Sequence, residues 1–318
     1  MNKYVPADKV NWEGRASHAQ LYLHEKIKLE SLTSLKTLKG QKKIALLGYA
    51  CDEGVRRNQG RVGASKGPDA LRKQLGKLPN HLPDETILLD AGNLHDIDAD
   101  VAQIHQSVID SVGKLLNANV FPIILGGGHD LAYAHYSALK ASIGPEKTLG
   151  IINFDAHFDL RSDVDGTTSG TPFLQIANDL KKEGKPLKYF CAGIRRDAND
   201  VDLFRTADAL GVIYLERPNF TMNYLEHVQL HIMQFLEDVD YIYTTIDIDG
   251  FSSAYAPGVS AASPMGFSPD IVLESLKLIL ESRKLIGLDV VELNPEFDRD
   301  HQTAKLAASL VHFVIHAI

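Results

Sequence analysis

Short apolar runs alternate with longer amphipathic stretches along most of the chain. The runs are rich in Ile, Val, Leu and Tyr and are apolar at nearly every position. That pattern is typical of parallel strands whose sheet is covered on both faces. We expect about eight strands, at Lys43–Gly48, Thr86–Asp90, Val120–Leu125, Leu149–Phe154, Leu187–Ala192, Gly211–Leu215, Tyr241–Ile248 and Leu285–Val291.

The stretches between these runs have helical periodicity. The expected helices are Val101–Asn117, Leu131–Ser142, Pro172–Lys182, Val201–Leu210, Asn223–Leu236, Pro269–Ser282 and Gln302–Ala317. Alternation of strands and helices predicts an α/β fold, a three-layer α/β/α sandwich around a mostly parallel sheet. Because no linker-like segment interrupts residues 41–318, we expect one domain there, preceded by a polar, partly helical extension over residues 1–40.

Composition and charge narrow the class of partner. The 318 residues include 33 basic and 41 acidic side chains, a formal net charge of −8. An acidic chain is poorly suited to nucleic acid or to a polybasic membrane anchor. Two cysteines, no visible signal peptide and no apolar run of membrane-spanning length predict a soluble cytoplasmic protein. We therefore expect a small-molecule substrate, with no nucleic acid and no membrane partner.

Residues able to do chemistry follow four of the expected strands. Gly126-Gly127-Gly128-His129-Asp130 follows one strand and Asp155-Ala156-His157-Phe158-Asp159 follows the next. Asp247 and Asp249 end a third strand, and Glu292 follows the last. Ligands of open α/β sheets bind beyond the carboxyl ends of the strands. The sequence therefore predicts that these segments converge at one site.

The converging side chains have the composition of a metal site. In the Asp-x-His-x-Asp segment, the i, i+2, i+4 spacing places three side chains on one side of an extended chain. The four carboxylates repel one another strongly unless cations offset them, and two divalent ions would balance their charge of −4. The imidazoles would complete the shells as neutral ligands. The predicted ligands are His129, Asp155, His157, Asp159, Asp247 and Asp249.

The predicted donor set also limits the metal and the reaction. Oxygen-rich ligation without thiolate suits Mn²⁺ or Mg²⁺, with Fe²⁺, Co²⁺ or Zn²⁺ as alternatives. Two such ions share a bridging water and lower its pKa, which predicts hydrolysis of a carbon–nitrogen or phosphorus–oxygen bond. The triple glycine before His129 lacks the spacing and the lysine of a phosphate-binding loop, so it could be only a tight turn.

Four segments resemble the signatures of the arginase–agmatinase (ureohydrolase) superfamily: GGGHD, NFDAHFD, DIDGFSSAYAPGVS and VVELNP. The resemblance extends over roughly residues 44–316, and the segments Gly48–Arg72 and Ser169–Phe173 are similar to its formimidoylglutamase branch. It implies an arginase/deacetylase-like fold, two Mn²⁺ ions per subunit and a homo-oligomer. It also implies hydrolysis of N-formimidoyl-L-glutamate to L-glutamate and formamide, a step of histidine degradation.

The resemblance assigns roles to the residues at the matching positions. One Mn²⁺ would be held by His129, Asp155, Asp159 and Asp247, and the other by Asp155, His157, Asp247 and Asp249. Asp159 would also hydrogen-bond the bridging hydroxide, which attacks the amidine carbon, and pass a proton to the leaving amine. Glu292 would orient the cationic formimidoyl group.

Departures from the arginase pattern bear on the substrate. Phe173 stands where arginases carry a histidine in an SGxxH segment, and Ser252-Ser253 stands where Asp-Pro is usual. These changes favour a substrate other than arginine. Because N-formimidoyl-L-glutamate carries two carboxylates, we expect cationic or amide donors around its distal end. The candidates for substrate binding are Asn58, Arg61 and Arg195.

Three other hypotheses remain open from the sequence. The chain could act on a guanidino compound such as arginine, agmatine or guanidinobutyrate. It could be a one-metal Zn²⁺ deacetylase, although the second Asp-x-Asp carboxylate and His129 would then have no role. It could also be a homologue that binds a ligand without turnover. Metal stoichiometry and substrate range separate these hypotheses.

Overall fold

The computed structural model of the protein describes residues 3–17, 19–35, 42–96 and 100–318. The eight expected strands are all present in it, with ends shifted by a few residues. They are β3 (Lys42–Ala50), β4 (Thr86–His95), β5 (Phe121–Gly126), β6 (Leu149–Phe154), β7 (Tyr189–Ile194), β8 (Ile213–Glu216), β9 (Tyr241–Asp247) and β10 (Leu285–Val291). Two short strands from the N-terminal extension, β1 (Lys3–Val5) and β2 (Lys28–Leu29), join the same sheet.

The expected helices are present as well. They are α4 (Val101–Asn117), α5 (Leu131–Ser142), α6 (Pro172–Lys182), α7 (Val201–Leu210), α8 (Leu225–Glu237), α9 (Pro269–Glu281) and α10 (Gln302–Ala317). Three shorter helices were not located from the sequence: α1 (Leu23–Lys26), which lies in the extension expected to be partly helical, α2 (Glu53–Arg57) and α3 (Gly67–Leu75). Segments of four to nine residues contain too few turns for a clear helical period.

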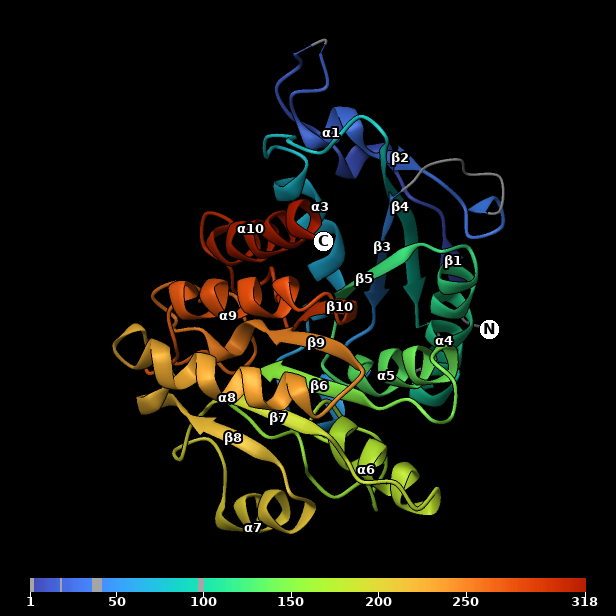
Figure 1. Ribbon diagram of the computed structural model, residues 1–318. Coiled ribbons are helices and arrows are strands. Elements are labelled where there is room, and N and C mark those ends of the chain that lie inside the picture. The colour runs from blue at the N-terminus through green and yellow to red at the C-terminus, as the bar shows by residue number, and fades with distance from the viewer. Residues whose placement is uncertain (1–2, 18, 36–41, 97–99) are drawn as a thin grey trace.

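The order of the strands brings four chemically important strand ends together. The sheet runs β1-β4-β3-β5-β10-β9-β6-β7-β8, with β2 paired to β4, and every pair except β1 with β4 is parallel. The last two strands, β9 and β10, lie between β5 and β6, which are consecutive in the chain (Figure 1). The carboxyl ends of β5, β10, β9 and β6 are therefore neighbours in the middle of the sheet.

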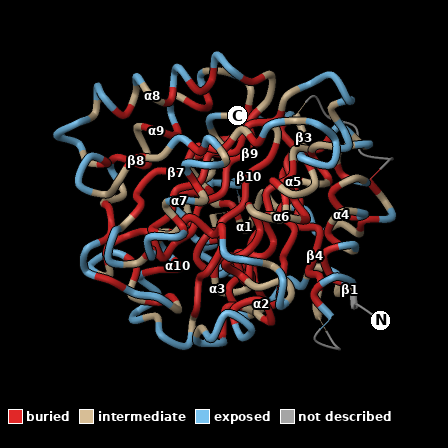
Figure 2. Tube along the Cα trace, turned by 90° about the horizontal axis from the view of Figure 1, so that it is seen from below, coloured by how far each residue is buried: buried red, intermediate tan, exposed pale blue. Residues whose placement is uncertain are grey.

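Helices cover both faces of the sheet, which makes the three layers of the sandwich. Helices α3, α8, α9 and α10 pack on one face, and α4, α5, α6 and α7 pack on the other (Figure 1). Alternate residues of β3 enter the two cores: Leu46 belongs to the first and Leu47 to the second. Both are fully buried, as are most strand residues (Figure 2), and replacing one by Ala typically costs about 2–5 kcal/mol.

The N-terminal extension is attached to the edge of the sheet by a buried polar cluster. The Trp12 indole donates to Asp90 Oδ2 at 2.8 Å, and Arg72 donates to Asp90 Oδ1 at 2.8 Å.

The division of the chain at residues 40 and 41 stays a prediction, and residues 1, 2, 18 and 36–40 of that extension lie outside the described residues. Among the described helices, none is both long enough and apolar enough to cross a membrane.

Candidate metal centre

The loop after β5, which carries His129, packs very closely against the backbone at the end of β3. A Cβ atom at Gly127 would lie 2.2 Å from the carbonyl oxygen of Cys51 and 2.5 Å from that of Tyr49. Only glycine fits there, so the triple glycine allows close backbone packing against β3. This packing delivers His129 to the central strand ends, and the reading of these glycines as a tight turn is the one that the geometry favours.

Two aspartates form local turns that place alternate side chains together. Asp155 Oδ1 accepts a hydrogen bond from the backbone N–H of His157 at 2.7 Å, and Asp247 Oδ1 accepts one from that of Asp249 at 2.8 Å. Each turn satisfies a backbone donor at a strand end. As a result, the side chains two residues apart approach the same point.

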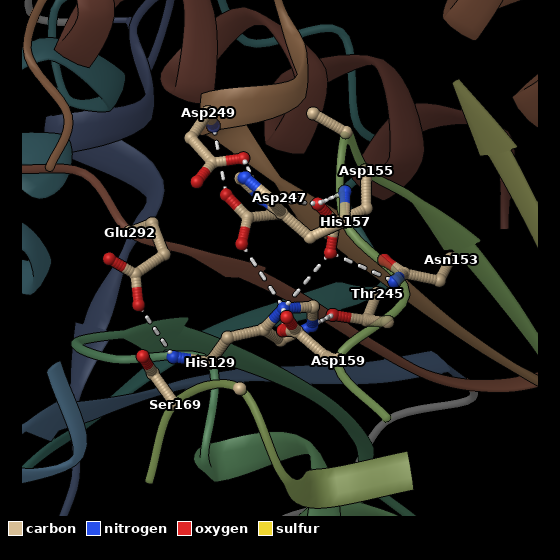
Figure 3. A network of polar contacts seen from close by, with 12 residues as sticks. His129, Asn153, Asp155, His157, Asp159, Ser169, Thr245, Asp247, Asp249 and Glu292 are labelled. Atoms are coloured by element: carbon tan, nitrogen blue, oxygen red, sulfur yellow. Dashed lines mark hydrogen bonds and ion pairs between the residues drawn. The ribbon is translucent and has the colours of Figure 1, made fainter. Parts of the chain in front are cut away.

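Two residues of the centre have left-handed backbone conformations. Asp159 has φ of 49° and Glu292 has φ of 65°. Such conformations cost free energy for residues other than glycine and concentrate at functional sites. Here they turn both carboxylates toward the strand ends, beside His129 (Figure 3).

The predicted ligands form two groups that share one carboxylate. The first group is His129, Asp155, Asp159 and Asp247, and the second is Asp155, His157 and Asp249 (Figure 3). In the first, His129 Nδ1 lies 2.8 Å from Asp159, 3.1 Å from Asp247 and 3.3 Å from Asp155. In the second, His157 Nδ1 lies 3.3 Å from both Asp155 and Asp249. Asp155 is thus placed to bridge, while Asp247 joins the first group only.

Unpartnered buried atoms show that the cluster fits cations. His129 Nδ1 and Asp249 Oδ1 are buried and make no hydrogen bond of acceptable geometry, although oppositely charged groups lie within 3.3 Å of each. The nitrogen lies 2.8–3.3 Å from an oxygen of each of three carboxylates. A buried polar atom without a partner is costly. Divalent cations bound between these atoms would satisfy them, and the donor set of carboxylate oxygens with imidazole suits Mn²⁺.

Electrostatics also indicate that the negative charge of the cluster needs to be offset. Burial raises the pKa of Asp247 well above its usual range, and the charges of Asp249 and Asp155 add to the effect. Burial and the Asp155 charge raise the pKa of Asp159. Burial lowers the pKa of His129, but its carboxylate neighbours outweigh this and hold that pKa well above the usual value. These shifts all favour the protonated forms, and bound cations would offset the same negative charge.

A ring of supporting contacts fixes the ligands. His129 Nε2 lies 3.0 Å from Thr245 Oγ1, and the Asn153 amide donates to Asp155 Oδ2 at 3.0 Å. Phe173 is fully buried and packs edge-on against the His129 ring, with 5.4 Å between ring centroids. It also stacks on Tyr189 at 4.4 Å. The position that holds histidine in arginases is therefore part of the apolar packing here.

A cavity of about 200 Å³ opens onto the cluster. Five of the six predicted ligands line it, and Asp155 lies buried beneath it. The other lining residues include Asn58, Arg161, Ser169 and Glu292. A larger cavity of about 830 Å³ contains none of the predicted ligands, so we assign the chemistry to the smaller one. Its volume is below the range of about 300–1,000 Å³ for drug-sized ligands, and so it suits a small metabolite.

Glu292 faces this cavity with a perturbed carboxyl group. Burial raises its pKa to about 8, with a contribution from the Asp249 charge. Its Oε1 accepts a hydrogen bond from the backbone N–H of His129 at 2.9 Å. A cationic group in the cavity would stabilise the ionised form of this carboxyl.

Of the three residues predicted to bind substrate, only Asn58 lines the cavity. Asn58 lines the cavity and donates to Ser169 Oγ at 3.2 Å. The Arg61 guanidinium donates to the carbonyl oxygens of Val259 and Ser260, at 2.6 and 3.0 Å. Arg195 forms a bidentate pair with Asp197, at 2.8 and 3.0 Å. Arg61 and Arg195 are therefore engaged with loops of their own chain.

Sequence reasoning missed Arg161, which also lines the cavity. Its Cδ lies 2.8 Å from where a Cβ of Gly170 would be, and the Asn58 amide lies 3.2 Å from the same point. Gly170 thus leaves room for both side chains. Within the described part of the chain, the exposed Arg161 guanidinium forms no ion pair. Its position two residues after Asp159 was the available signal.

The sequence is similar to known proteins over nearly its whole length. The Arginase family profile matches residues 42–316. The chain belongs to the arginase family. Among curated members, it is 40% identical to the formimidoylglutamase of Clostridium tetani, over 99% of this chain and 96% of that protein.

Solved structures of the arginase family have the same fold. The formimidoylglutamase structure from Bacillus subtilis has a TM-score of 0.77 and 25% sequence identity, and covers 96% of this chain and 93% of its own. The Trypanosoma cruzi formiminoglutamase structure, determined with Mn²⁺, has a TM-score of 0.76 and 22% identity, over 91% of this chain and 98% of that one. These similarities confirm the predicted α/β/α architecture.

Proposed function

We propose that the chain is a formimidoylglutamase, which hydrolyses N-formimidoyl-L-glutamate to L-glutamate and formamide with two Mn²⁺ ions. The observation that carries the proposal is the shared position of Asp155 in two His/Asp groups beneath a cavity lined by Glu292 and Arg161. Sequence identities of 40% and 39% to curated formimidoylglutamases, over 99% and 98% of this chain, support the choice of substrate within the arginase family.

The site residues divide the work of this hydrolysis. His129, Asp155, Asp159 and Asp247 would hold one cation, and Asp155, His157 and Asp249 the other. When bound, such a pair supplies Lewis acidity and an activated water. Glu292 accepts the N–H groups of the cationic amidine through the oxygen that His129 leaves available. Asp159 would transfer a proton to the leaving nitrogen.

The outer part of the cavity is suited to the glutamate moiety. The Arg161 guanidinium can bind a carboxylate in bidentate fashion, and the Asn58 amide beside it adds a neutral donor. Agmatine has no carboxylate and would leave Arg161 without a partner. The buried Phe173 offers no proton-accepting group beside His129. The first feature favours a carboxylated substrate over agmatine, and the second favours a substrate other than arginine.

We also propose a cytoplasmic, homo-oligomeric enzyme. Cys51 and Cys191 are buried and unpaired, which agrees with a reducing compartment. Size-exclusion chromatography with light scattering tests the oligomeric state: a mass near 35.0 kDa would contradict it, since that is the mass of one chain.

A substrate panel tests the reaction. Protein loaded with Mn²⁺ is incubated separately with N-formimidoyl-L-glutamate, arginine and agmatine, while glutamate, formamide and urea are quantified. We expect glutamate and formamide in equal amounts from the first compound and no urea from the others. Urea production from arginine or agmatine would still support a hydrolytic metal centre, but it would contradict N-formimidoyl-L-glutamate as the substrate.

A further inference from the structure

Thr245 contacts the His129 ring at the nitrogen that does not face the carboxylates. It lies on β9, two residues before Asp247, and its Oγ1 is 3.0 Å from His129 Nε2 (Figure 3). Both side chains are buried. A neutral imidazole carries hydrogen on one nitrogen only. A cation can therefore bind His129 Nδ1 only when that hydrogen is on Nε2.

A buried carboxylate orients the polar groups next to Thr245. Asp289 pairs with Thr245 in the sheet register between β10 and β9. Its Oδ2 accepts hydrogen bonds from the Tyr243 hydroxyl at 2.5 Å and from His135 Nδ1 at 2.8 Å, and all three side chains are fully buried. Because a carboxylate can only accept, Tyr243 donates its single hydrogen to Asp289. The Tyr243 oxygen is then available as an acceptor.

The Thr245 hydroxyl interacts with this Tyr243 oxygen. Burial and the Asp289 charge raise the pKa of Tyr243, and the Thr245 hydroxyl lowers it. A Thr245 hydrogen directed to Tyr243 would leave only lone pairs toward His129. Nε2 would then be the donor of the 3.0 Å contact.

We propose that Thr245 is a positioning residue that, oriented by Tyr243 and Asp289, keeps the hydrogen of His129 on Nε2 and leaves Nδ1 for the cation. The inference rests on the proposed function, because it takes the cation to be Mn²⁺. Contacts of this kind fix ligand orientation, and their loss typically weakens metal binding about 10- to 100-fold.

Replacing Thr245 by Val tests the proposal, and the adjacent Thr244 supplies a matched control. Thr244 is on the same strand and fully buried, and its hydroxyl has no hydrogen-bond partner among the described residues. Mn²⁺ binding to metal-free protein is measured by isothermal titration calorimetry. We expect Thr245→Val to weaken one of the two sites about 10- to 100-fold. Thr245→Ser and Thr244→Val should both bind as the wild type does.

The outcomes are distinguishable. Equal Mn²⁺ affinities for Thr245→Val and Thr244→Val would overturn the proposal, and so would equal weakening at both sites. Weakening at both sites would indicate general disruption, which melting curves of the metal-free variants would show. If the wild type binds two Mn²⁺ ions without releasing formamide, the proposed function fails, while site-selective weakening in Thr245→Val would still support the role of Thr245.

Discussion

Glu292 Oε1 accepts a hydrogen bond from the backbone N–H of His129 at 2.9 Å. The two residues follow β10 and β5, which are neighbours in the sheet. This bond joins a proposed metal ligand to the carboxylate proposed to hold the substrate. An amidine bound to Glu292 would be held at a fixed distance from the cluster, which is the geometric basis of the proposed catalysis.

Asp155→Asn tests the shared ligand. The amide keeps the shape of the side chain but removes the charge that both groups use. We expect fewer than two Mn²⁺ ions per chain by elemental analysis and a loss of at least about 100-fold in kcat, since a direct ligand matters more than its supporting contacts. Asp165→Asn, in an exposed loop, is the control. Two tightly bound ions and full activity in Asp155→Asn would contradict the assignment.

Arg161→Met tests recognition of the substrate carboxylates. A lost hydrogen bond to a charged group costs about 1.5–3 kcal/mol, so we expect KM for N-formimidoyl-L-glutamate to rise about 10- to 100-fold with little change in kcat. Steady-state kinetics measure both constants. Arg61→Met is the control, because Arg61 is bound to the carbonyl groups of Val259 and Ser260. A rise in KM for Arg61→Met alone would restore Arg61 as the carboxylate-binding residue.

Phe173→His tests whether one residue separates this chain from arginases. The imidazole would replace a fully buried ring packed between His129 and Tyr189. Burial of an unpartnered polar group typically costs about 1–3 kcal/mol, so urea denaturation should show a less stable protein. We expect no arginine hydrolysis, since the outer cavity is unchanged. Urea release from arginine by this variant would show that Phe173 alone determines the substrate.

Metal removal should destabilise the protein more as pH rises. Burial and Asp249 raise the pKa of Glu292 from 4.5 to about 8. Between those values the folded, metal-free protein holds a proton that the unfolded chain releases, so stability falls with rising pH. Burial raises the pKa of Asp159 and Asp247 in the same direction. Mn²⁺ at about 100 times its Kd would add about 2.7 kcal/mol for each site.

Melting curves of the metal-free protein at pH 5 and pH 8 check this prediction. Glu292→Gln cannot release that proton, so its Tm should fall less between the two values than the Tm of the wild type. An equal fall in both proteins would show that Glu292 does not contribute to the pH dependence.

Much of the fold was predictable because the strands are apolar on both faces. The runs that became β3 to β10 are long enough to recognise, whereas β1 and β2 have three and two residues. The insertion of β10 and β9 between β5 and β6 was not predictable from local pattern, because strand order depends on long-range packing. That insertion places the four functional strand ends side by side.

The candidate site also has a part that the sequence predicted and a part that only the fold reveals. Five of the six proposed ligands could be predicted because Asp-x-His-x-Asp and Asp-x-Asp have recognisable local spacing, and His129 because it follows a triple glycine at a strand end. Arg161 is a single arginine in a polar loop, and only the fold shows that it lines the cavity. Thr245 lies in an apolar strand and gave no signal of contact with His129, 116 positions earlier in the chain.

The central claim is that hydrolysis of the amidine needs both cation sites. The most direct test adds Mn²⁺ stepwise to metal-free protein while the initial rate of formamide release from N-formimidoyl-L-glutamate is followed. The rate should rise to a plateau at two equivalents per chain, because Asp155 belongs to both groups. A plateau at one equivalent, or formamide release without added metal, would contradict the account.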